Sequence, residues 1–191
     1  MAEKDIENPK VAGRVDLSQR ITINVMTVMD VEAIIAGQKG KPLSQDPKNA
    51  TQIGHSYIFM SSDDPRGWSA ADPGNIILNA QVGDTLDFFC ASTSANSEDA
   101  AFIVALGGGE PVLDPSHVDV LTLEKAAQPT PPNGYPFKFV PQTFSSCDAK
   151  VRQPGTAQNF WATAALFTLA GDGNGQVLAG YVTWDPTVVV K

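Results

Sequence analysis

Residues 160–184, with the sequence FWATAALFTLAGDGNGQVLAGYVTW, decide the fold class. Two apolar runs, 160–169 and 176–184, flank residues 171–175, where glycine, aspartate and asparagine readily adopt positive φ. This pattern predicts a β-hairpin. Apolar residues occupy both alternating sets of positions in each run. We therefore expect both faces of the hairpin to be covered, one by another sheet and the other by something else, for which another subunit is a candidate.

Short apolar segments between glycine and proline turns fill much of the remaining chain. Residues 21–29 begin with the alternation of a half-buried strand, and Asp30 is placed to cap a helical turn at 31–36. Residues 53–60 resemble a second strand, and the fully apolar run 100–106 predicts a central one. We expect an all-β fold: an antiparallel β-sandwich of jelly-roll type, with long loops and at most one or two short helical turns.

The length and composition bound the organisation of the chain. A chain of 191 residues suits one domain. Residues 1–17 are charged and lack periodicity, which predicts a flexible N-terminal arm ahead of a single β-sandwich domain at 18–191.

Charge and hydropathy argue against two classes of partner. The 13 Lys and Arg residues are outnumbered by 21 Asp and Glu residues, giving a net charge of -8, whereas nucleic-acid binding relies on basic side chains that replace counterions. No apolar run is long enough to cross a bilayer, and residues 1–8 lack the apolar segment of a secretory signal. We expect a cytoplasmic protein that binds neither nucleic acid nor membrane.

The sequence lacks the catalytic motifs that can be recognised by spacing, including Gly-x-Ser-x-Gly, His-Glu-x-x-His and the phosphate-binding loop. A Ser-His or Cys-His pair would have to use His55 or His117, so a small-molecule hydrolase ranks third among the possible functions. Cys90 and Cys147 have no metal-ligand spacing, and we expect buried free thiols rather than a disulfide. The sequence predicts no enzyme and no required cofactor.

Two loops are candidate ligand sites. Asp63 and Asp64, followed by Trp68, offer carboxylates for sugar hydroxyls and an aromatic ring for stacking. Asp172 and Asn174 alternate with glycine in a pattern that can surround Ca²⁺, although a plain hairpin turn is the commoner structure for such residues.

A third group, Asp114, His117 and Asp119, places two carboxylates around one imidazole. Such a group can form half of a metal site. A solvated loop whose histidine is hydrogen-bonded locally is the commoner outcome.

Four segments carry a resemblance to a known family: Asp30–Ala36, Ile53–Met60, Ala80–Phe88 and Gly180–Thr187. In this order they resemble the PixA/AidA family of bacterial inclusion-body proteins, and the similarity runs from about Arg20 to Val190. The resemblance implies a non-enzymatic protein made in quantity in the cytoplasm, stored as inclusions in some members and under quorum-sensing control in others. It implies no catalytic residues.

These observations favour a self-associating protein that acts by assembly or binding, with a homodimer as the expected oligomer. The doubly apolar hairpin at 160–184 is the expected contact surface, through Trp161, Phe167, Tyr181 and Trp184. The alternative is a lectin-like carbohydrate-binding protein, assisted by calcium.

Overall fold

The computed structural model describes residues 19–70 and 72–191, so the arm predicted at 1–17 lies outside the described residues. Strands dominate and the all-β class is confirmed. The strands are β1 (Thr22–Met29), β2 (Thr51–Gln52), β3 (Ile58–Ser62), β4 (Trp68–Ser69), β5 (Ile76–Leu78), β6 (Thr85–Ser92), β7 (Ala100–Gly107), β8 (His117–Gln128), β9 (Lys138–Lys150), β10 (Gly155–Thr156), β11 (Trp161–Leu169), β12 (Gln176–Trp184) and β13 (Val188–Val190).

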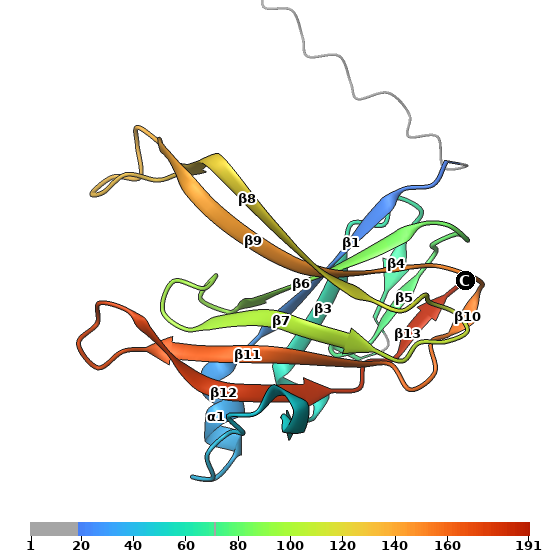
Figure 1. Ribbon diagram of the computed structural model, residues 1–191, viewed down its shortest axis with the longest axis horizontal. Coiled ribbons are helices and arrows are strands. Elements are labelled where there is room, and N and C mark those ends of the chain that lie inside the picture. The colour runs from blue at the N-terminus through green and yellow to red at the C-terminus, as the bar shows by residue number, and fades with distance from the viewer. Residues whose placement is uncertain (1–18, 71) are drawn as a thin grey trace, which may run out of the picture.

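The strands form three sheets (Figure 1), ordered β3-β1-β6-β9-β8, β2-β12-β11-β7 and β10-β13-β5-β4. Three pairs are parallel, namely β1 with β6, β2 with β12 and β5 with β13. The expectation of a purely antiparallel sandwich is therefore wrong. Parallel neighbours need long connections, and each of these pairs joins strands far apart in the chain. This mixed pairing does not show a jelly roll.

The helical segments are short, as expected, but the described residues contain three of them, whereas one or two at most were predicted. They are α1 (Val31–Gly37), η1 (Pro47–Asn49) and η2 (His55–Tyr57). Asp30 caps α1 by accepting a hydrogen bond from the backbone N–H of Ala33 at 3.0 Å, as predicted. The extra turn, η2, occupies the first part of 53–60, so the strand predicted there begins only at Ile58.

The hydrophobic core lies between the five-stranded sheet and the β2-β12-β11-β7 sheet, and the third sheet adds Ile76, Leu78, Val188 and Val190 to it. Ile23, Val25 and Phe88 are buried on the five-stranded sheet, and Ala164 and Val182 are buried on the sheet that contains β11 and β12. The rings of Phe88 and Phe160, the latter just before β11, pack with 5.5 Å between their centroids. The alternation predicted for residues 21–29 is confirmed, because every second residue of β1 from Ile23 is buried.

The hairpin predicted at 160–184 is confirmed as β11 and β12, which pair antiparallel. Buried residues occupy both faces of β11 between Ala162 and Leu166. The prediction that 100–106 forms a central strand is wrong. This segment forms β7, which among the described residues pairs only with β11 and lies at the edge of its sheet. Ala100, Ala101, Ile103 and Leu106 are buried on the sheet faces, which does not require a strand partner on both edges.

Strands β8 and β9, at one edge of the five-stranded sheet, form a second long hairpin whose far end extends beyond the other strands (Figure 1). Only Cys147 to Lys150 of β9 pair with β6. On the N-terminal side of Cys147, β9 pairs with β8 alone among the described residues.

Candidate functional site

The β8–β9 hairpin, residues 117–150, exposes more large apolar side chains than any other part of the described chain. Val120 and Phe139 are each 67% exposed and Tyr135 is 76% exposed. The other exposed apolar residues of this hairpin are Val118, Leu121, Leu123, Phe137 and Phe144. Exposed apolar side chains gathered in this way are typical of a protein contact site.

Strand register divides these side chains between the two faces of the hairpin. Val118 lies opposite Cys147, which is fully buried, so their common face continues the core face of the large sheet. Alternation places Val120 and Phe139 on this same face, which we call the inner face. The outer face carries Leu121, Leu123 and Phe144, with Leu121 opposite Phe144.

The edges of the hairpin are poorly suited to adding another strand. The register shifts between Leu123 and Ala126, where β8 has one residue more than β9. Pro141 lies opposite this irregularity and has no N–H to donate. Bulges and prolines block edge-to-edge pairing, so contact through the apolar faces is favoured over sheet extension.

The four residues predicted to form a subunit contact in the β11–β12 hairpin do not lie together. Trp184 is 1% exposed and belongs to the core, so its predicted interface role is wrong. Trp161 is 42% exposed and shares a pocket with Tyr181. Phe167 lies farther along β11 and packs edge-on against Phe102, with 5.9 Å between ring centroids.

The carboxylates predicted to bind sugar already have protein partners. Asp63 accepts hydrogen bonds from the backbone and side chain of Asn24 at 2.7 and 2.6 Å. Asp64 is 5% exposed and accepts from the backbone N–H groups of Arg66 and Asn79 at 3.0 and 2.9 Å. Trp68, in β4, is 41% exposed.

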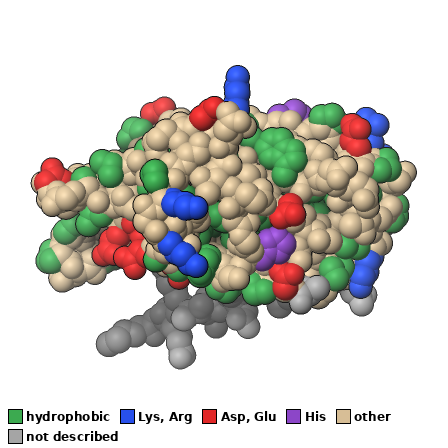
Figure 2. Space-filling model, turned by 90° about the horizontal axis from the view of Figure 1, so that it is seen from below, with side chains coloured by type: hydrophobic (Ala, Val, Ile, Leu, Met, Phe, Trp, Pro, Cys, Tyr) green, Lys and Arg blue, Asp and Glu red, His purple; other side chains and the backbone are tan. Residues whose placement is uncertain are grey.

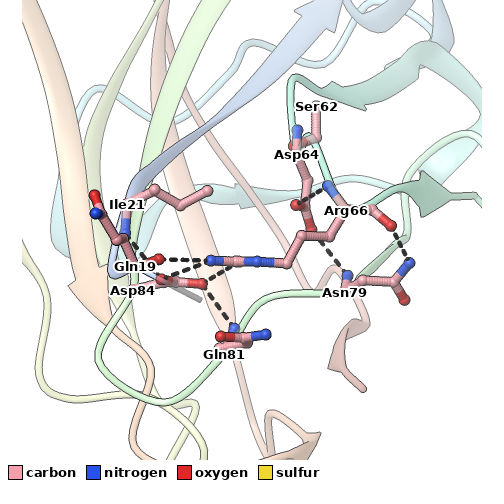
Figure 3. A network of polar contacts seen from close by, with 8 residues as sticks. All are labelled: Gln19, Ile21, Ser62, Asp64, Arg66, Asn79, Gln81 and Asp84. Atoms are coloured by element: carbon pink, nitrogen blue, oxygen red, sulfur yellow. Dashed lines mark hydrogen bonds and ion pairs between the residues drawn. The ribbon is translucent and has the colours of Figure 1, made fainter. Parts of the chain in front are cut away.

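Asp64 is part of a buried network that sequence reasoning missed (Figure 3). Arg66 reaches across to Asp84 and forms an ion pair at 2.5 Å, with side chains 6% and 0% exposed. Asp84 also accepts from the backbone N–H groups of Ile21 and Gln81 at 3.0 and 2.7 Å. The pair therefore joins the loop after β3 to the beginnings of β1 and β6. Because 17 residues separate Arg66 from Asp84, no local sequence motif indicates that the two side chains pair.

Neither predicted metal loop forms a cluster of ligands. Asp172 accepts from the backbone N–H of Asn174 at 3.0 Å, as in an ordinary turn. His117 pairs with Asp148, whereas Asp114 pairs with Arg152. Within residues 19–70 and 72–191, no three His, Cys, Asp or Glu side chains are grouped to hold a metal.

Both histidines face carboxylates. Nδ1 of His55 lies 3.4 Å from Asp72 and its Nε2 lies 3.6 Å from Asp185. Asp148 is the partner of His117. In the described part of the chain neither imidazole is hydrogen-bonded to a serine or cysteine, the geometry that a nucleophile pair requires.

The pKa of His117 lies above its ordinary value, because Asp148 accepts a hydrogen bond and the charges of Asp148, Asp119 and Asp114 favour the imidazolium. The stabilisation from this pair is present below the unfolded pKa of about 6.5 and is lost as pH rises through the folded pKa. An NMR titration of the imidazole is expected to show the raised pKa, and Asp148→Asn to lower it. An unchanged pKa in Asp148→Asn would contradict this assignment.

The two cysteines are free thiols, as predicted, with Cys147 buried and Cys90 only partly buried. Burial raises the pKa of Cys90 to about 12 and that of Cys147 to about 11, with the nearby carboxylates of Asp87, Asp148 and Asp119 adding to the shift at Cys147. We expect neither thiol to react with Ellman's reagent in the native protein, and both to react in denaturant. Fast reaction of either thiol in the native protein would refute the assignment.

Comparisons with known proteins show to which family the chain belongs. No curated protein matches the chain. The crystal structure of the inclusion body protein PixA from Burkholderia cenocepacia J2315 has the same fold, with a TM-score of 0.73 and 23% sequence identity, over 93% of this chain and 100% of that chain. No helix in the described residues has the length and apolar character needed to span a membrane. The family model described as PixA, inclusion body protein, matches residues 21–190, and the chain belongs to this family.

Proposed function

We propose that this protein acts by self-association, without catalysis, and that two copies meet through the inner faces of their β8–β9 hairpins. The observation that carries the proposal is the exposed apolar surface on this hairpin. Val118, Val120 and Phe139 continue the core face of the large sheet beyond the point where the protein's own core covers it. Burying such a surface against an identical one removes both from water.

The exposed apolar area of the whole hairpin, both faces together, is comparable to the share of one partner in a standard interface, and contact through the inner faces buries part of it. The eight exposed apolar side chains of the hairpin present surface on the order of 800 Å². One partner in a standard protein interface contributes about 800 Å². Because the apolar side chains lie on both faces, contact through the inner faces leaves Leu121, Leu123 and Phe144 on the outer faces for contacts between dimers. This second contact gives a route from dimers to larger assemblies.

Light scattering coupled to gel filtration tests the proposal directly. The mass of the full chain is expected to exceed that of the monomer, 20.2 kDa, and to rise further with concentration. A constant monomer mass up to millimolar concentration would refute self-association.

The family description, inclusion body protein, supports one further part of the proposal, storage as inclusions, to which we add synthesis in quantity in the cytoplasm. We add control by quorum sensing to the proposal. Imaging of cells at low and high density tests these parts, with dense bodies containing the protein expected at high density. A diffuse distribution at both densities would contradict them.

Carbohydrate binding is a second proposal, for which the exposed Trp68 is the supporting observation. Asp63 and Asp64 would have to exchange protein partners for sugar hydroxyls, and this weakens the proposal. Calcium assistance would use Asp172 and Asn174. A glycan array with and without chelator tests both ideas, and no binding in either condition would remove them.

A further inference from the structure

A pocket of about 530 Å³ opens on the β2-β12-β11-β7 sheet, on the face turned away from the core. This volume lies within the range of small-molecule sites in proteins. Its floor comes from β7, β11 and β12, and one wall comes from η1 and the residue that follows it. The lining residues are Pro47, Lys48, Asn49, Ala50, Val104, Ala105, Trp161, Thr163, Tyr181 and Thr183.

Trp161 supplies an aromatic surface to this pocket. Its indole lies across Gly107, where a Cβ atom would fall 2.3 Å from the ring. One part of the indole is thus packed against the strand backbone, and the side chain is still 42% exposed. A ring held flat in this way is suited to stacking on a planar ligand. Tyr181 adds a second aromatic side chain to the lining.

The wall of the pocket is held in place independently of any ligand. Residues 51 and 52 pair with β12, and the backbone N–H of Tyr181 donates to the carbonyl of Ser44 at 2.7 Å. The side chain of Gln45 donates to the carbonyl of Ala179 at 2.9 Å. A preformed wall lowers the entropy cost of binding.

Lys48 is the one charged residue in the lining. Two of the other polar side chains already have partners: Thr183 donates to the carbonyl of Ala162 at 2.9 Å, and the Asn49 amide donates to Asp46 at 2.7 Å. The pocket therefore offers aromatic and aliphatic walls with a single positive charge. On the face shown in Figure 2, charged side chains are scattered among hydrophobic ones rather than gathered in one region.

We propose that this pocket binds a planar apolar small molecule that carries one acidic group, with the ring on Trp161 and the acidic group paired with Lys48. This site is separate from the β8–β9 hairpin, so its occupancy is independent of the proposed self-association.

Two fluorescent probes test the proposal: 1-anilinonaphthalene-8-sulfonate, which is anionic, and N-phenyl-1-naphthylamine, which has the same rings without the sulfonate. Lys48→Ala is expected to weaken binding of the anionic probe about fivefold and to leave the neutral probe unchanged. Trp161→Ala is expected to weaken both roughly tenfold or more. Lys41→Ala, in the loop between α1 and η1, is the control and is expected to change neither.

A second variant guards against misfolding of Trp161→Ala. Ala50→Trp fills the pocket from the loop side without altering the sheet, and is expected to abolish binding of both probes there. Unchanged affinity of both probes in Ala50→Trp and Lys48→Ala would overturn the proposal. A fall in solution mass in Trp161→Ala would also overturn it, because it would make this face a contact between copies.

Discussion

Replacing Asp84 by alanine is expected to lower the free energy of unfolding by about 3–5 kcal/mol, the typical effect of removing one partner of a buried ion pair. The variant leaves the Arg66 guanidinium, 6% exposed, without its carboxylate. It also leaves the backbone N–H groups of Ile21 and Gln81 without an acceptor. Urea denaturation measures the change. Asp63→Ala removes an exposed carboxylate from the neighbouring loop and serves as the control, with an expected loss of about 1 kcal/mol.

A double-mutant cycle separates the ion pair from the other contacts of Asp84. Arg66→Met is expected to be strongly destabilising alone, because it leaves Asp84 charged and buried. Combined with Asp84→Ala it is expected to cost much less than the two single losses together. Additive losses would show that the two side chains are not coupled and would refute the assignment.

The ion pair of Arg66 with Asp84 also makes the free energy of unfolding depend on pH in the acid range. Burial alone would raise the pKa of Asp84, but hydrogen bonds from Arg66, Gln81 and Ile21, together with the charge of Arg66, hold it below its ordinary value. The stabilisation is present above the unfolded pKa of about 3.9 and is lost as pH falls through the folded pKa. The loss of stability in acid is therefore expected to be shallower in Asp84→Ala than in the native sequence.

The double variant Val120→Asp/Phe139→Asp is expected to weaken self-association by about 100-fold or more. Both side chains are 67% exposed on the inner face, where two carboxylates per copy would repel their counterparts and keep water bound. Sedimentation velocity over a concentration series measures the shift. Because both positions are already exposed, the monomer is expected to remain folded.

Val82→Asp is the matched control for this variant. Val82 is 53% exposed in the turn before β6, well separated in sequence from the β8–β9 hairpin. We expect it to associate like the unmodified chain. Equal weakening by Val82→Asp and by the hairpin variant would indicate a general effect of added charge and would contradict a contact at the hairpin.

Local patterns predicted the elements that depend on local physics. The hairpin at β11 and β12 follows from two apolar runs around a glycine-rich turn, and α1 follows from the capping side chain of Asp30. Pairings between distant segments have no such local signal. The parallel alignment of β1 with β6 and the ion pair of Arg66 with Asp84 depend on tertiary structure alone.

The contact surface that we propose differs from the one predicted from the sequence for a related reason. A strand such as β11, with apolar residues on both faces, is expected to be buried on both faces, but its sequence does not tell whether its own chain or another subunit covers it. In the structure, Trp184 of the paired strand β12 is covered by its own chain. The alternation of aromatic and polar residues in 137–144 is equally compatible with a half-buried strand. Only the three-dimensional structure shows that residues 137–144 extend beyond the part of β9 that pairs with β6.

Cross-linking at Val120→Cys tests the central claim most directly, because it reports whether two β8–β9 hairpins lie against each other. Cys90 and Cys147 are expected to remain unreactive, since burial raises the pKa of their thiols to about 12 and about 11. With a short bismaleimide, Val120→Cys is expected to give a covalent dimer, and Val82→Cys is expected to remain monomeric. Absence of the Val120→Cys dimer in a sample whose solution mass exceeds the monomer would contradict assembly through this hairpin.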